Sequence, residues 1–117
     1  MIEKLPFEVP TELRKRRGCI VNMVDIHAER PTADHAVYCM AKAANAMMVK
    51  ALAHDLAPEI RVNGIAPGAA LWPDTDMTDS TRQAILERIP MGRPAGADQI
   101  AAAVMFMITG PDYITGQ

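Results

Sequence analysis

The sequence has few cysteines, few aromatic residues and no excess of positive charge. Its two cysteines, Cys19 and Cys39, do not form the dense pattern of a small disulfide-stabilised secreted domain. The formal net charge of −2 leaves no broad basic surface, so we expect no nucleic-acid partner despite the short basic run Arg14 to Arg17. Three histidines lack the paired spacing of metal ligands, and we therefore expect no metal site.

Long apolar runs are also absent. No segment approaches the roughly 20 apolar residues needed to cross a membrane without a charge or a proline. The first residues lack the basic start and apolar stretch of a secretory leader. These features predict a soluble, cytoplasmic protein with reduced thiols and no membrane partner. With 117 residues, 50% of them hydrophobic, we expect one modest core, with residues 1–117 forming one domain or part of one.

The patterns that are present alternate between strand and helix. The apolar run Cys19 to Val24 predicts a buried strand, and Ile60 to Ala66 predicts a second one. Between them, Ala36 to Ala57 is rich in Ala, Met, Leu and Lys and predicts a long helix, with Asp34 as its N-cap and Pro58 as its stop. Parallel strands joined through a helix predict an α/β fold.

Shorter elements flank this unit. Thr11 to Arg14 predicts a brief helical turn, residues 81–88 and 97–109 predict helices, and residues 113–117 resemble the start of a further strand. The long helix is apolar around most of its circumference, so both its own sheet and another layer or subunit must cover it. We therefore expect a homo-oligomer, a dimer or a tetramer, assembled through residues 35–57.

Tyr38 and Lys42 are the first candidates for chemistry. They lie four positions apart on the long helix, so they share one face. An ammonium beside a phenol lowers the pKa of the phenol and makes it a usable proton donor. The same spacing is common in helices that only pack a surface tyrosine along a lysine stem, so the pair by itself leaves both interpretations open.

Several segments in fixed order resemble the second half of the short-chain dehydrogenase/reductase family. These segments are Val21-Asn22, Tyr38 to Ala44, Leu56-Ala57-Pro58, Ile60 to Asn63, Ala66-Pro67-Gly68 and Tyr113 to Gln117. The resemblance covers residues 18–117. It implies a partial Rossmann-like fold of three layers, with parallel strands flanked by helices, that lacks the amino-terminal βαβ half and its glycine-rich phosphate turn.

The resemblance also implies roles for individual residues. Tyr38 is the expected catalytic acid, and Lys42 is expected to hold the nicotinamide ribose and to tune Tyr38. The cofactor neighbours that it implies are Asn22, Tyr38, Lys42, Pro67, Gly68 and Ala70. NADPH is the expected cofactor, with NADH not excluded. For Pro67-Gly68 a plain turn is the alternative interpretation. Because the phosphate turn is not found, we expect the chain alone neither to bind NADPH tightly nor to reduce dihydrobiopterin.

Asp25 departs from the usual family pattern, because most members have a serine at this distance before Tyr38. Aspartate there, within Asn22 to Asp25, is similar to pteridine and dihydromonapterin reductases, as is Leu71-Trp72-Pro73. This implies NADPH-dependent reduction of a dihydropterin or dihydrofolate. The catalytic residues implied are Asp25, Tyr38 and Lys42, and the substrate contacts implied are Asp25, Tyr38, Leu71 and Trp72.

Other interpretations of Asp25 and of the chain remain. Asp25 is also a common residue type for a turn or helix cap at the end of a strand. An ionised Asp25 would oppose ionisation of Tyr38, which suits a tyrosine that works as a protonated donor. The chain is alternatively part of a short-chain alcohol or ketone dehydrogenase, or a non-catalytic remnant that only self-associates.

Overall fold

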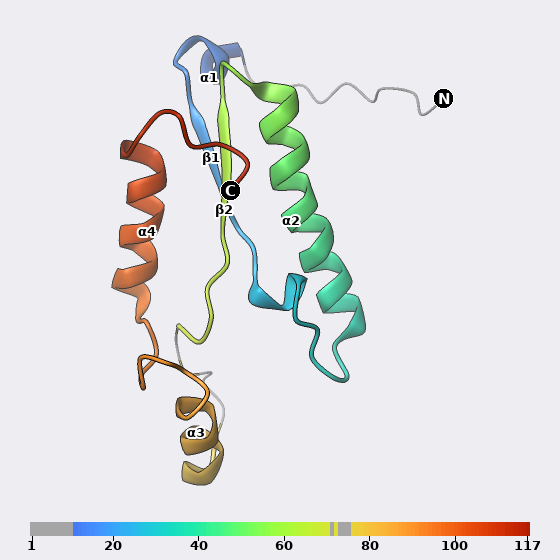
Figure 1. The fold of residues 1–117 in the computed structure, drawn as a ribbon, viewed down its shortest axis with the longest axis vertical. Coiled ribbons are helices and arrows are strands. Elements are labelled where there is room, and N and C mark those ends of the chain that lie inside the picture. Colours follow the sequence, from blue (N-terminus) through green and yellow to red (C-terminus); the bar gives the residue numbers. More distant parts are fainter. Residues whose placement is uncertain (1–10, 71, 73–75) are drawn as a thin grey trace.

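The computed structural model describes residues 11–70, 72 and 76–117. Along the chain the elements are α1 (Thr11–Lys15), β1 (Cys19–Met23), the 3₁₀ helix η1 (Ile26–Ala28), α2 (Ala36–Leu56), β2 (Arg61–Ile65), α3 (Asp79–Leu86) and α4 (Ala97–Thr109), as Figure 1 shows. Leu71, one of the predicted substrate contacts, lies outside the described residues.

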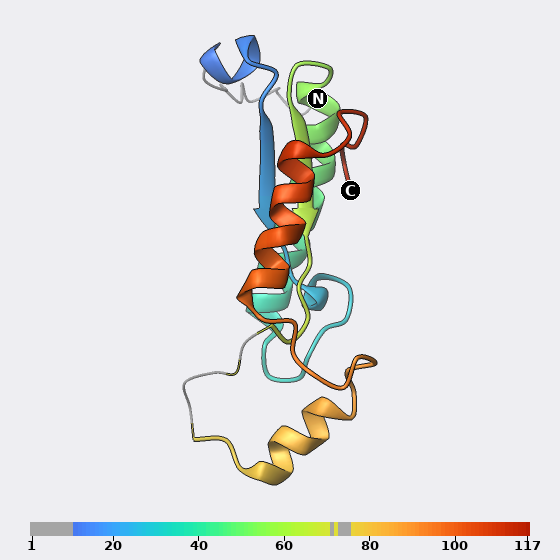
Figure 2. The same ribbon diagram turned by 90° about the vertical axis from the view of Figure 1, so that its left-hand side faces the viewer.

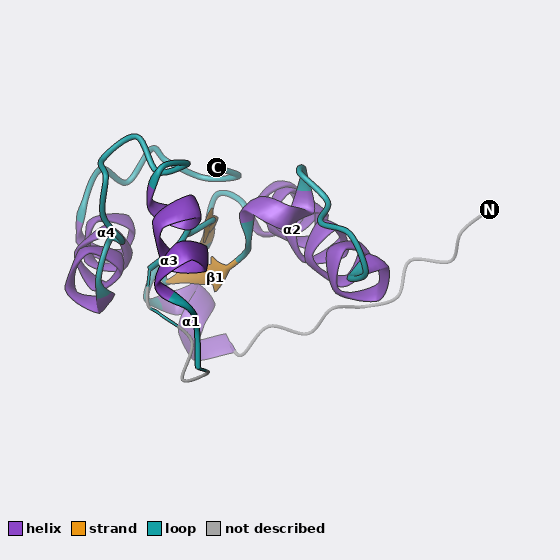
Figure 3. Cartoon of the chain, turned by 90° about the horizontal axis from the view of Figure 1, so that it is seen from below, coloured by secondary structure: helices purple, strands orange, loops and turns teal. Residues whose placement is uncertain are grey.

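The two strands form a parallel sheet in which Cys19 lies opposite Arg61 and Met23 lies opposite Ile65. The helix α2 joins them and packs on one side, while α4 packs on the other (Figures 1 and 2). Seen from below in Figure 3, α2 and α4 stand on opposite sides of the strands. The predicted three-layer arrangement of parallel strands between helices is therefore confirmed.

One face of α2 builds the core. Val49, Ala53 and Leu56 recur at the spacing of one helical face and pack against Ile60, just before β2, and Val62 within it. All five are almost fully buried, with exposed fractions of 5% or less. Burial of one such aliphatic side chain contributes roughly 1.5–3 kcal/mol, so this cluster holds α2 against the sheet.

The opposite face of α2 is exposed. Val37, Met40 and Met47 keep 76%, 63% and 62% of their surface in solvent. The second layer predicted to cover this helix is thus not supplied by the described part of the chain, and self-association stays a prediction. None of the described helices combines the length and the apolar character that crossing a bilayer requires.

The tail after α4 runs beside β2 without becoming a strand. Gly116 donates its backbone N–H to the carbonyl of Val62 at 2.7 Å. The fully buried Asn63 side chain donates to the carbonyl of Ile114 at 2.9 Å and accepts from the N–H of Gln117 at 3.1 Å. Because a side chain makes part of the pairing, the regular ladder of a strand is interrupted.

Helix boundaries agree with the sequence patterns to within one residue except for α3, and the N-cap of α2 also differs from the prediction. Asp34 is not the N-cap of α2: it lies in the left-handed region at φ 63°, and His35 takes the cap position without a side-chain hydrogen bond. Helix α3 begins two residues earlier than predicted, because the Thr78 hydroxyl accepts from the N–H of Thr81 at 3.2 Å and caps it, and it ends at Leu86 rather than at residue 88.

Candidate active site

The carboxyl end of β1 and the first turns of α2 converge. Asp25 follows β1 by two residues and begins η1, which packs against α2 (Figure 1). The Tyr38 hydroxyl, on the first turn of α2, donates a hydrogen bond of 2.5 Å to Oδ2 of Asp25. Two of the three predicted catalytic residues are therefore in direct contact, at the end of a parallel strand where ligands of such sheets bind.

Each carboxylate oxygen of Asp25 accepts a different hydrogen bond. While Oδ2 accepts from Tyr38, Oδ1 accepts from the N–H of His27 at 2.8 Å and caps η1. Desolvation alone would raise the pKa of Asp25, but these two hydrogen bonds, with the coulombic effects of His27 and Lys42, outweigh it and lower the pKa below its usual value. Asp25 is consequently both the cap that its position allows and an ionised group beside Tyr38.

Tyr38 stays protonated in this arrangement. Its hydrogen bond to Asp25 is the main reason that its pKa is raised, and desolvation and the negative charge of Asp25 act in the same direction. The Lys42 ammonium lies 5.8 Å from the centroid of the Tyr38 ring. The predicted lowering of the tyrosine pKa by Lys42 is therefore wrong for this structure, whereas the predicted opposition of Asp25 to the phenolate is confirmed.

Lys42 belongs to a small polar network that sequence reasoning missed. Its ammonium donates to the carbonyl of Met23 at 3.3 Å, and the side-chain amide of Asn45 donates to the same oxygen at 3.2 Å. The Asn45 side-chain oxygen accepts in turn from the amide of Asn22. The available signal was the spacing of Tyr38, Lys42 and Asn45, which places all three on one helical face.

The loop after β2 carries the other predicted cofactor neighbours, Pro67 to Ala70. A Cβ added to Gly68 would meet no described atom within 4 Å, so the backbone there faces open space. Beyond it, the carbonyl of Ala69 accepts from the N–H of Ala95 at 3.1 Å, and that of Ala70 accepts from Gly96 at 2.9 Å. The loop is thereby fastened to the segment between α3 and α4.

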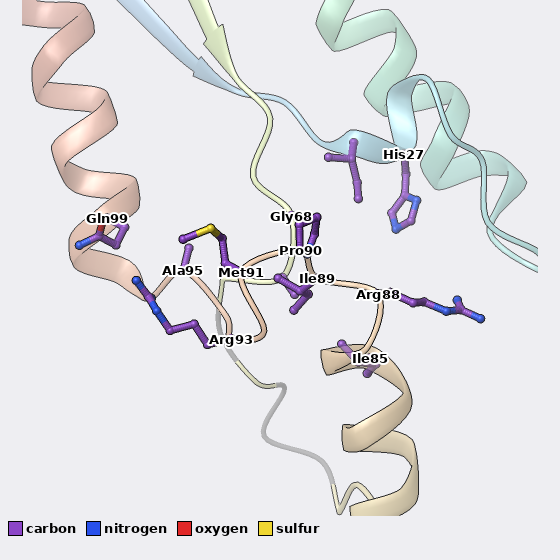
Figure 4. A pocket seen from close by; sticks show the side chains of 12 residues that line it. His27, Gly68, Ile85, Arg88, Ile89, Pro90, Met91, Arg93, Ala95 and Gln99 are labelled. Carbon is purple, nitrogen blue, oxygen red and sulfur yellow. The ribbon is translucent and has the colours of Figure 1, made fainter.

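A pocket of about 650 Å³ lies between η1, this loop, the segment after α3 and the start of α4 (Figure 4). The lining residues are Ile26, His27, Gly68, Ala69, Ile85, Arg88, Ile89, Pro90, Met91, Arg93, Ala95 and Gln99. Its wall is mainly apolar, and Ile26 also borders a second hollow that Asp25 lines. The pocket therefore adjoins the Asp25 side of the site and has the size of a small-molecule site.

Trp72, a predicted substrate contact, is half-buried and lies against α3. The guanidinium carbon of Arg82 is 5.0 Å from the centroid of its ring, within the range of a cation–π contact. The described residues thus bring together Asp25, Tyr38 and Lys42, while the contact found for Trp72 is with a helix rather than with those three side chains.

Comparison with known proteins gives one consistent result. A family model described as enoyl-(acyl carrier protein) reductase matches residues 8–117. The uncharacterized oxidoreductase YmfI of Bacillus subtilis is 40% identical over 115 residues, which cover 93% of this chain and 46% of that protein. The 3-oxoacyl-[acyl-carrier-protein] reductase FabG of Rickettsia prowazekii is 36% identical, with 90% and 45% covered, and the L-xylulose reductase of Caenorhabditis elegans is 35% identical, with 82% and 40% covered.

Solved structures agree with these matches. The apo SCOR enzyme of Clostridium thermocellum superposes with a TM-score of 0.76 at 33% identity, covering 90% of this chain and 40% of that one. A Burkholderia xenovorans protein described as a short-chain dehydrogenase/reductase gives a TM-score of 0.72 at 28% identity, covering 85% and 38%. The chain spans less than half the length of these relatives. By the family match, the identities and the fold, the chain belongs to the short-chain dehydrogenase/reductase family of oxidoreductases.

Proposed function

We propose that the protein containing this chain is an NADPH-dependent reductase of a pteridine ring, acting on a dihydropterin or dihydrofolate. The observation that carries the proposal is the 2.5 Å hydrogen bond from a protonated Tyr38 to an ionised Asp25. An ionised carboxylate only accepts hydrogen bonds. It therefore suits a substrate that presents N–H groups, as a pteridine ring does, and it repels the carbonyl oxygen of a ketone.

Reduction of a ring C=N bond requires a proton on the nitrogen while the adjacent carbon receives hydride. Tyr38 holds that proton at its hydroxyl oxygen and donates it to Oδ2 of Asp25 before the substrate binds, so the O–H must turn from Asp25 to the ring nitrogen for the transfer. The Asp25 carboxylate also disfavours an ionised Tyr38 before the substrate binds, so the Tyr38 hydroxyl keeps its proton. Tyr38 is 42% exposed, so a ring that enters from the solvent side can reach it.

The residues present fit the nicotinamide end of the cofactor. Tyr38 and Lys42 are hydrogen-bond donors on one helical face, a set that suits the paired hydroxyls of a ribose. The open backbone at Gly68 allows the cofactor or substrate to approach the loop. When bound, the reduced nicotinamide supplies the hydride. The choice of NADPH rests on the family resemblance, and the two free thiols, Cys19 and Cys39, support a reducing, cytoplasmic compartment.

Reduction of a ketone is the second candidate, and the activities for which two relatives are named favour it. The Caenorhabditis elegans relative is an L-xylulose reductase, and the Rickettsia prowazekii relative is a 3-oxoacyl-[acyl-carrier-protein] reductase. In that case Asp25 would be an incidental cap of η1. Activity on simple ketones without activity on pterins would decide for this candidate, and turnover of neither substrate class would decide for a non-catalytic module.

We further propose that the chain works with an amino-terminal βαβ half and as a homo-oligomer. The exposed apolar face of α2, with Val37, Met40 and Met47, is the surface that a second copy would cover. Sedimentation of the assembled protein should show a dimer or tetramer, and Met47→Glu should dissociate it. We define the assembled protein as the product of the whole reading frame that encodes this chain. If that frame encodes these 117 residues alone, the assembled protein is the fusion of this chain to the amino-terminal half of Bacillus subtilis YmfI.

The test of the reaction uses Tyr38→Phe in the assembled protein. Loss of the proton donor should lower NADPH-dependent reduction of dihydrobiopterin by about 10²–10⁴-fold, the usual contribution of a positioned general acid. Lys15→Gln, an exposed substitution at the end of α1, serves as the control and should leave turnover unchanged. Pterin reduction that survives in Tyr38→Phe would refute the assigned role.

A further inference from the structure

Asn45 has no part in the reaction proposed above, yet it is bound into the same network as Lys42. It lies one helical turn beyond Lys42, and both side chains are half-buried. Both donate to a single oxygen, the carbonyl of Met23, at 3.2 Å from Asn45 and 3.3 Å from Lys42. Met23 is the last residue of β1, so this oxygen marks the strand end that leads to Asp25.

We propose that Asn45 is a positioning residue that frees Lys42 to bind the ribose hydroxyls of the nicotinamide cofactor. The inference rests on the proposed function, because it assigns Lys42 its cofactor role. Asn45 shares the acceptor of Lys42 and keeps the Met23 carbonyl hydrogen-bonded when the ammonium turns away. Without Asn45, Lys42 would be the sole side-chain donor to that carbonyl and would be held there.

The orientation of the Asn45 amide is fixed by a second contact. The side-chain N–H₂ of Asn22 donates to the oxygen of Asn45, so the nitrogen of Asn45 is the end that faces Met23. An amide that flipped would place two acceptors together and lose both bonds. Asn22 on β1 and Asn45 on α2 thus form one unit, and the predicted cofactor neighbour Asn22 acts on Lys42 through it.

The consequence is a cost that appears only when the cofactor binds. A carbonyl has two lone pairs, and in this structure two donors use them. Moving Lys42 to the ribose then leaves one bond in place. After removal of Asn45, the same movement of Lys42 leaves the Met23 carbonyl without a side-chain donor. The loss of one hydrogen bond corresponds to a decrease of about 3- to 10-fold in the affinity for the cofactor.

The experiment compares Asn45→Leu and Asn45→Asp with the assembled wild-type protein. Leucine removes both amide contacts at similar volume, and the KM for NADPH should rise about 3- to 10-fold with little change in kcat at saturating cofactor. Aspartate keeps an acceptor for Asn22 but adds a negative charge that holds the Lys42 ammonium, so its KM should rise at least as much. Lys15→Gln is again the control.

The outcomes separate this inference from the proposed function. A residue with a purely structural role would lower the melting temperature and the active fraction in both variants while leaving the KM for NADPH unchanged, and that result would overturn the inference. Should Tyr38→Phe abolish turnover while the Asn45 variants keep the wild-type KM, the inference fails and the reaction stands. Should Tyr38→Phe retain turnover, the proposed function itself fails.

Discussion

The buried amide of Asn63 gives the sharpest test of how this fold is held together. Asn63 has no exposed surface, donates to the carbonyl of Ile114 and accepts from the N–H of Gln117. Its side chain joins β2 to the tail after α4, beside the backbone hydrogen bond from Gly116 to Val62. Replacement by alanine removes both bonds and leaves the two backbone groups of the tail without their side-chain partner.

The size of the effect follows from these contacts. Each hydrogen bond contributes about 0.5–1.5 kcal/mol, and a buried partner left unsatisfied adds to the loss, so Asn63→Ala should reduce the free energy of unfolding by roughly 2–4 kcal/mol. Domains are stable by only about 5–15 kcal/mol, which makes this a large fraction. With a urea m-value of about 2 kcal/mol/M, the midpoint should fall by about 1–2 M.

The assay is equilibrium urea unfolding of the assembled protein, followed by circular dichroism. Gln117→Ala is the matched control: its side chain makes only an exposed contact of 3.4 Å to the carbonyl of Thr115, and its backbone N–H still reaches Asn63. That variant should stay within about 0.5 kcal/mol of the wild type. If Asn63→Ala also stayed within that range, the view that this amide anchors the tail would be refuted.

Two further predictions concern the site and the sheet. In the assembled protein, the difference between the ultraviolet tyrosinate titrations with and without Tyr38→Phe gives the transition of Tyr38. Asp25→Asn should move that transition to lower pH, because the hydrogen bond to the Asp25 carboxylate raises the pKa of Tyr38 in the wild type; a transition that stays in place or moves upward would contradict this. Arg61→Lys should destabilise the assembled protein by about 1–3 kcal/mol, because the guanidinium donates to the carbonyls of Met107 and Ile108 at the end of α4 and a lysine cannot span both. Thermal unfolding measures this loss of stability, and an unchanged midpoint would show that the Arg61 guanidinium does not hold the end of α4 in place.

Local patterns in the sequence determined the element types and their order. The apolar run from Cys19 specifies β1, the Ala- and Met-rich segment with Pro58 beyond it specifies α2, and residues 97–109 specify α4. Strand, helix and strand in succession leave few topologies, and the right-handed parallel unit is the common one. The four-residue spacing then placed Tyr38 and Lys42 together on one helical face, because of the periodicity of α2, and the family resemblance supplied their expected roles.

Only the tertiary structure decided which side chains meet across elements. The contact between Asp25 and Tyr38 depends on how α2 is seated against η1, and that contact reversed the predicted sign of the Tyr38 pKa shift. Asn45 and Asn63 looked like ordinary polar residues, because their partners lie on other elements: Asn22 and Met23 for Asn45, and the tail for Asn63. Periodicity fixes the face a residue occupies, whereas the register between packed elements fixes its hydrogen bonds, and this register is set by the whole core.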